Sequence, residues 1–177
     1  DMLGLKAIVA SATSDSTAYK SLGGIDSSAT GNSFWQSYVE DTSTPLTLGI
    51  LSTMQNGISQ GTNKTPDFHI TTSTLWEKYE GLLVPSQRFS DSKTAEAGFT
   101  NLLYKGAPVT FDIDCTSGTW YALNSKYIKL KRHSKVWFSQ TPFMRPTNQN
   151  ARYAQIICMG QLVTPQRRRL GKLQNKS

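Results

Sequence analysis

Asp112 and Asp114 form the carboxylate pair in this sequence whose spacing best suits chemistry. Two residues that are two apart on a strand point to the same face, with roughly 7 Å between their Cα atoms. Carboxylates at that separation can bind a cation or share acid–base work. The next residues, Cys115-Thr116-Ser117-Gly118, are typical of a turn, where a carboxylate commonly accepts backbone hydrogen bonds. We therefore expect the pair to stabilise a turn and not to catalyse a reaction.

The histidines and cysteines offer no stronger site. His69 lies in a strand-like stretch and His133 in a basic run, and neither belongs to a known catalytic or metal-binding motif. Cys115 and Cys158 lack the spacing of a zinc site or a disulfide scaffold, which favours a reducing, cytoplasmic setting. The sequence therefore predicts no enzyme, no metal site and no cofactor.

Charge is divided unevenly along the chain. The 177 residues carry a formal net charge of +7, yet all 12 acidic residues lie between Asp1 and Asp114. Residues 121–177 contain 12 of the 19 lysines and arginines and no acidic residue. This asymmetry points to a polyanion or an acidic protein surface as the partner of the basic third.

Two groups of cations are the candidates for that contact. They are a C-terminal cationic tail with Arg167, Arg168, Arg169 and Lys172, and a basic run with Lys129, Lys131 and Arg132 beside Tyr127 and Trp137. Cations interleaved with aromatic residues suit phosphate contact and base stacking. Because like charges repel and extend a chain, plain solvation of the tail is the alternative. No recognised motif predicts sequence-specific reading of nucleic acid.

The elements that must position these residues begin with two helices. Apolar residues at every third or fourth position predict a helix that begins near Thr44-Pro45 and is capped by Gly61; they are Leu46, Ile50, Leu51, Met54 and Ile58. A strand over residues 66–71 precedes a second helix, with Thr74 and Glu77 as its capping box and Pro85 as its end.

Strands account for most of the remainder. Residues 102–114 read as two strands interrupted at Gly106-Ala107-Pro108, and further strands are expected at 120–124, 127–133 and 151–163. Strands and helices in this mixed order predict an α+β fold. No stretch approaches the roughly 20 apolar residues of a membrane-spanning helix, so we expect no membrane partner.

Six stretches, in order, resemble the major capsid proteins of tailed bacteriophages with the Hong Kong 97-type fold. They are "LGLKAIV", "GGIDSSATGNSFW", "PDFHITTSTLWEKYE", "GFTNLLYKGAPVTFDID", "WYALNSKYIKLK" and "NQNARYAQIICMGQLVTPQRRRLGKL". The resemblance spans nearly the whole chain. It implies a C-terminal portion that lacks the N-terminal arm, the extended loop and much of the spine helix of that family.

The resemblance also implies domains and partners. Residues 1–44 would belong to a peripheral domain, 45–147 to an axial domain, and 148–177 to a return strand into the peripheral domain with a basic tail. Subunits of this family assemble with themselves into pentamers and hexamers around double-stranded DNA. The expected location is the virion capsid, assembled in the bacterial host cytoplasm, and further partners would be scaffolding, portal or decoration proteins. No catalytic or crosslinking residue is implied.

Two other functions stay open on the sequence alone. The basic third could serve a stand-alone module that binds nucleic acid without sequence preference. An enzyme that acts on an acidic substrate through Asp112 and Asp114 is the third reading.

Overall fold

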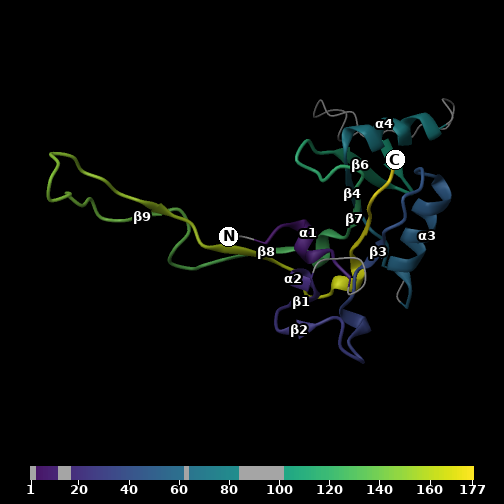
Figure 1. Cartoon of the computed structure of the whole chain (residues 1–177), viewed down its shortest axis with the longest axis horizontal. Coiled ribbons are helices and arrows are strands. Elements are labelled where there is room, and N and C mark those ends of the chain that lie inside the picture. Colours follow the sequence, from purple (N-terminus) through teal and green to yellow (C-terminus); the bar gives the residue numbers. More distant parts are fainter. Residues whose placement is uncertain (1–2, 12–16, 62–63, 84–101) are drawn as a thin grey trace.

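A six-stranded mixed β-sheet forms the centre of the computed structural model, which describes the chain except for residues 1–2, 12–16, 62–63 and 84–101 (Figure 1). The strand order is β3 (Tyr38–Glu40), β12 (Gly171–Leu173), β7 (Trp120–Leu123), β4 (Phe68–Thr71), β6 (Ala107–Phe111) and β5 (Leu102–Tyr104). Parallel pairs join β3 to β12 and β4 to β6, and the other neighbours are antiparallel. The α+β prediction is therefore confirmed.

β12 lies between two strands that are made much earlier in the chain. Gly171 is opposite Tyr38 on β3 and opposite Ala122 on β7. A Cβ on Gly171 would lie 2.5 Å from Cδ1 of Ile58, so the absence of a side chain lets the neighbouring helix approach this strand closely. Gly171–Leu173 is thus part of the core of the sheet.

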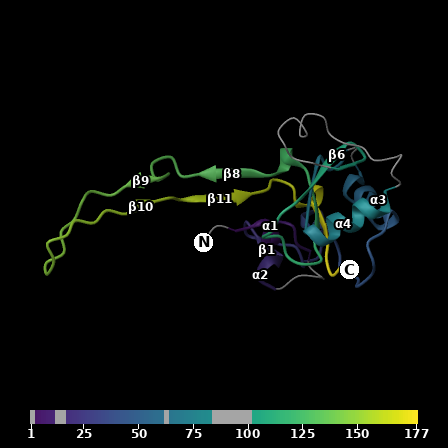
Figure 2. The same ribbon diagram turned by 90° about the horizontal axis from the view of Figure 1, so that it is seen from above.

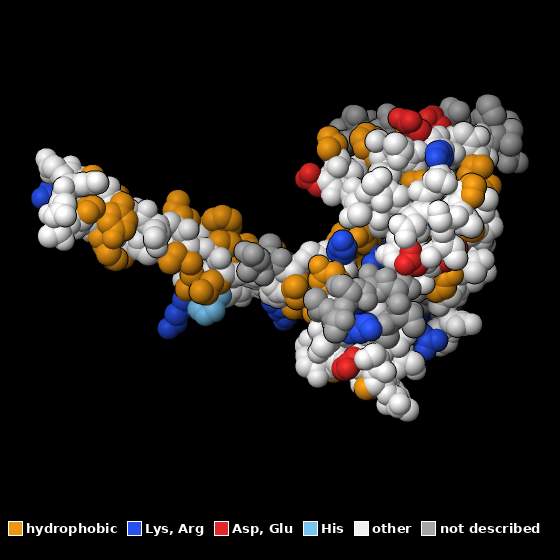
Figure 3. Space-filling model, in the orientation of Figure 1, with side chains coloured by type: hydrophobic (Ala, Val, Ile, Leu, Met, Phe, Trp, Pro, Cys, Tyr) orange, Lys and Arg blue, Asp and Glu red, His pale blue; other side chains and the backbone are white. Residues whose placement is uncertain are grey.

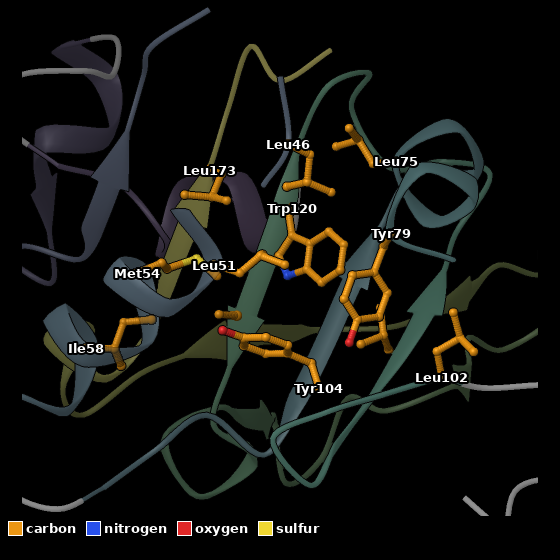
Figure 4. Packing of buried hydrophobic residues seen from close by; sticks show 12 residues of the cluster. Leu46, Leu51, Met54, Ile58, Leu75, Tyr79, Leu102, Tyr104, Trp120 and Leu173 are labelled. Atoms are coloured by element: carbon orange, nitrogen blue, oxygen red, sulfur yellow. The ribbon is translucent and has the colours of Figure 1, made fainter. Parts of the chain in front are cut away.

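Two helices, α3 (Leu48–Ser59) and α4 (Ser73–Leu82), cover one face of the sheet. Trp120 projects from β7 into the cluster between sheet and helices (Figure 4). Its ring meets that of Tyr79 with centroids 5.4 Å apart and planes at 74°, an edge-to-face arrangement that aromatic pairs prefer. The buried members of this cluster are Leu46, Leu51, Met54, Ile58, Leu75, Tyr79, Leu102, Tyr104, Val109, Trp120, Ala122 and Leu173.

Both helices begin at a different residue from the one predicted. Thr47, not Thr44, caps α3, and its Oγ1 accepts from the backbone N–H of Ile50 at 3.3 Å. Thr72, not Thr74, caps α4 through the N–H of Leu75. In each case the capping threonine has the extended backbone that the N-cap position needs. The predicted apolar face of α3 and the turn at Gly61, which has φ +81°, are confirmed.

The opposite face of the sheet is covered by the N-terminal segments. Ile8 and Val9, at the end of α1 (Leu5–Ile8), pack with Tyr121, Leu123 and Leu170. Short elements follow α1: α2 (Thr17–Lys20), β1 (Ser21–Leu22), β2 (Ile25–Asp26) and the 3-10 turn η1 (Ser33–Trp35). The sheet therefore has a core on each face.

A long two-stranded arm projects from this body (Figures 1 and 2). We call residues 129–163 the arm and the rest of the described chain the body. Near the body β8 (Lys129–Arg132) pairs with β11 (Gly160–Val163), and farther out β9 (Ser139–Gln140) pairs with β10 (Ile156–Ile157). The single bridge between Met144 and Tyr153 lies still farther along. The strand expected over 151–163 is therefore divided into two short strands.

The arm spans the end of the expected axial domain and the start of the expected return strand. The boundary between residues 147 and 148 falls beyond the last bridge of the arm, where the chain turns back. Residues 1–44 supply β3 to the central sheet as well as the covering segments. Among the described helices, none has the length and apolar character that crossing a bilayer requires.

Candidate interaction surface

Large apolar side chains stand in solvent along the arm. Ile156 is 72% exposed, Phe138 67% and Phe143 66%. Leu130, Met144, Tyr153 and Met159 are also exposed. Figure 3 shows hydrophobic side chains along much of the arm. A two-stranded ribbon alone is marginally stable in water, and contiguous exposed apolar surface marks an interaction site.

The same arm is cationic. Its six lysines and arginines are all exposed: Lys129, Lys131, Arg132, Lys135, Arg145 and Arg152. No acidic residue follows Asp114 in the sequence, so these charges have no opposite charge on the arm itself. The arm therefore combines apolar contact area with a single sign of charge, a pattern that suits an acidic and partly apolar partner surface.

An ordered bulge shapes the middle of the arm. Six residues, 133–138, connect β8 to β9, whereas only two connect β10 to β11 on the facing strand. His133 Nδ1 accepts from the backbone N–H of Lys135 at 3.3 Å and of Val136 at 3.1 Å. Phe138 has φ +51°, and its ring contacts that of Trp137 edge-on at 5.3 Å. The bulge therefore holds Phe138 in a fixed exposed position.

The arginine triplet does not form the cationic tail that the sequence offered as a contact surface or, alternatively, as a solvated segment, because two of its three side chains are buried. Arg167, in the 3-10 turn η4 (Arg167–Arg169), is fully buried and donates to carbonyl oxygens of the N-terminal segments. Its Nε lies 2.9 Å from Ile8 O, and its Nη2 lies 3.2 Å from Ala7 O and 3.1 Å from Tyr19 O. This guanidinium joins the N-terminal and C-terminal parts of the body, so it cannot contact DNA or a neighbouring protein.

Arg169, Lys172 and Lys176 are also buried in the body. Arg169 Nη1 donates to Ile58 O at 3.1 Å and Gln60 O at 3.4 Å, at the carboxyl end of α3, where the helix dipole favours a cation. Lys172 is buried within β12. Lys176 Nζ is buried 3.1 Å from Glu40 Oε1 and donates to Thr42 and Thr44.

Of the seven cations predicted as contact residues, four remain exposed: Arg168, Lys129, Lys131 and Arg132. The last three share β8, whereas Arg168 lies on the body. The apolar side chains of the arm were missed altogether. The available signal was the pair of prolines, Pro142 and Pro146, on either side of Phe143 and Met144, because proline cannot donate in a strand ladder.

The other candidate groups of the sequence have structural roles. Asp112 Oδ1 accepts from the backbone N–H of Asp114 at 3.0 Å, which is the expected turn. His69 is buried, and its Nδ1 accepts from Trp120 Nε1 at 3.2 Å. Burial lowers the pKa of His69 to about 4 despite the opposing charge of Asp67, so the ring is neutral at physiological pH.

The cysteines and the metal-ligating groups do not converge. Burial raises the pKa of Cys115 to about 11, and the charge of Asp112 adds to the shift. Cys158 is exposed on the arm, and both thiols are free. Within the described residues, no three side chains of His, Cys, Asp or Glu gather in a way that could hold a metal ion.

Comparison with solved structures identifies the fold. A chain of the cyanophage A-1(L) capsid asymmetric unit superposes with a TM-score of 0.60 and 14% identity, over 96% of this chain and 64% of that one. A chain of the holo-SrpI encapsulin complex from Synechococcus elongatus PCC 7942 gives 0.52 and 13%, over 78% of this chain and 53% of that one. This chain thus spans less than two thirds of either neighbour. No family model matches it, and no curated protein matches it by sequence. The chain has the Hong Kong 97-type capsid fold that the resemblance predicted.

Proposed function

We propose that this chain is a structural subunit that assembles with copies of itself into the icosahedral capsid of a tailed phage. The observation that carries the proposal is the arm, which extends apolar and cationic side chains away from the body. A lone subunit leaves these side chains in water, whereas a neighbouring subunit would cover them.

The proposal has finer parts, which the likeness to a phage capsid chain supports only in outline. The subunits form pentamers and hexamers, and the resulting shell encloses double-stranded DNA. Assembly takes place in the cytoplasm of a bacterial host, with scaffolding, portal or decoration proteins as further partners. The exposed cations Arg168, Lys129, Lys131 and Arg132 contact neighbouring subunits or the enclosed DNA.

The first test compares the size of assemblies formed by the chain and by an arm variant. In the variant Phe143→Asp/Ile156→Asp, two carboxylates replace exposed apolar side chains, so folding is unaffected while burial at an interface becomes costly. Light scattering and electron microscopy should show multimers for the chain and monomers for the variant. The control Phe34→Asp changes an exposed aromatic residue of the body and should leave the multimers intact. A monomeric wild-type chain, or an arm variant that assembles normally, contradicts the proposal.

A nucleic-acid-binding module is the second candidate, because the six arm cations have no acidic neighbour on the arm. Its test is salt-dependent binding of double-stranded DNA by the dilute wild-type chain, because the arm variant would place two carboxylates among these cations. Each phosphate neutralised should contribute about −0.9 to the slope of log K against log salt concentration. Charge reversal of Lys129, Lys131 and Arg132 should then flatten the slope. If DNA binding is absent or does not depend on salt concentration, the nucleic-acid-binding module is excluded and the shell subunit remains.

A further inference from the structure

A second exposed apolar surface lies on the body, at the corner that follows β6. We call residues 111–114 the corner. Ile113 is 91% exposed there, and Phe111 is 51% exposed. Asp112 and Asp114 flank Ile113, and both are exposed. The corner thus combines apolar side chains with negative charge, whereas the arm combines them with positive charge.

Hydrogen bonds hold the corner in a defined shape. The Asp112 N–H donates to Thr71 O at 2.9 Å, which ties the corner to the end of β4. Asp112 then accepts twice, through Oδ1 from the Asp114 N–H at 3.0 Å and through its carbonyl from the Cys115 N–H at 3.2 Å. The tip that carries Ile113 is therefore an ordered turn that presents the side chain outward at little further entropic cost on binding.

Neighbouring elements extend the corner into a surface. On one side, the ring of Phe111 contacts that of Trp76 on α4, with centroids 5.7 Å apart, and the next residue, Glu77, is exposed. On the other side, a hollow of about 250 Å³ opens beside Asp112 and Asp114. Lys6 lines this hollow together with Ile70 and Tyr121, so its charge is mixed and part of its wall is apolar. The hollow can accept one large apolar side chain.

We infer that the corner of one copy is the docking site for the arm of a second copy. The inference rests on the proposed self-assembly and names the surface that receives the arm. Opposite charges would align the partners, and the apolar side chains of arm and corner would cover one another. Because arm and corner are different patches, each copy uses one of each in two different contacts. When its arm and its corner contact different neighbours, such a heterologous contact builds a ring where the rotation between copies closes.

The test pairs the arm variant with a corner variant. Ile113→Arg/Asp114→Arg places two cations opposite the basic arm and keeps Asp112, which forms the turn. Self-association of this variant should weaken about tenfold or more, to the level of the arm variant. Leu48→Arg, at an exposed leucine of α3 away from the corner, is the matched control and should assemble as the wild-type chain does.

Mixing the two variants gives the sharper result. The corner variant keeps an intact arm and the arm variant keeps an intact corner, so the mixture should form a one-to-one dimer that grows no further. Two results would overturn the inference. One is that the mixture forms no dimer. The other is that the corner variant assembles normally while the arm variant does not, and in that case self-assembly itself stands. If the wild-type chain itself stays monomeric, the proposed function fails as well.

A disulfide trap provides an independent measurement. One chain carries Ile113→Cys and the other Ile156→Cys, both with Cys158→Ser, and air oxidation with a copper catalyst joins thiols that come into contact. We expect a crosslinked dimer from the mixture. A chain with Leu48→Cys and Cys158→Ser in place of the corner cysteine should give none, and equal crosslinking at both positions would count against the corner.

Discussion

Replacement of Arg167 by methionine tests whether this arginine is a structural residue of the body. Methionine keeps much of the apolar stem but removes the guanidinium and its three hydrogen bonds to Ile8 O, Ala7 O and Tyr19 O. Hydrogen bonds to a charged group contribute about 1.5–3 kcal/mol each. Part of that gain is offset, because the variant no longer buries a charge. We therefore expect the free energy of unfolding to fall by about 3–5 kcal/mol.

The measurement is urea unfolding followed by circular dichroism, in the monomeric arm variant so that association does not add to stability. For a chain of this length the loss corresponds to a fall in Tm of roughly 6–20 °C. Arg168→Met is the matched control, since Arg168 is exposed in the same turn and should change stability by no more than about 0.5 kcal/mol. If Arg167→Met lies within about 1 kcal/mol of its parent, the assignment of Arg167 as a structural cation is refuted.

Three further predictions concern a histidine, a glycine and the two cysteines. The pKa of His69 is about 4 when folded and 6.5 when unfolded. Its contribution to the free energy of unfolding is therefore complete above pH 6.5 and falls by roughly 3 kcal/mol towards pH 4. His69→Gln should abolish this part of the pH dependence in urea unfolding. Gly57→Ala places a Cβ 2.6 Å from the ring of Tyr38, and should destabilise by about 1–2 kcal/mol although alanine favours a helix; unchanged stability would mean that the ring moves freely. With a thiol reagent near neutral pH, Cys158 should react at once and the half-buried Cys115 more slowly, because burial raises the pKa of its thiol to about 11; two equally fast phases would contradict this difference.

Elements formed by local sequence were the predictable ones. The spacing of Leu51, Met54 and Ile58 identified α3, because a helix places such residues on one face regardless of what covers them. Its first residue was misplaced, because several threonines precede it and the Oγ1 of Thr44 accepts instead from Lys176, which is distant in sequence. Local pattern thus predicted the element but not its tertiary partners.

The arginine triplet could not be interpreted from composition. Whether Arg167 faces solvent depends on the carbonyl groups of residues 7, 8 and 19, which only the fold brings near it. The arm is the opposite case, because apolar residues are exposed there. Residues such as Phe143 and Ile156 count as core candidates by hydropathy, yet both are exposed because the ribbon leaves the body. Charge asymmetry was visible in the sequence, but its division between buried and exposed cations was not.

The position of β12 sets the order of events during synthesis. The ribosome makes the arm before it makes Gly171–Leu173, the strand that fills the gap between β3 and β7. Until that strand emerges, β3 has no partner in the central sheet and the nascent chain cannot complete its fold. A chain that ends within the arm lacks the strand that joins β3 to the rest of the sheet, so premature termination should yield polypeptides that do not complete the body and are degraded.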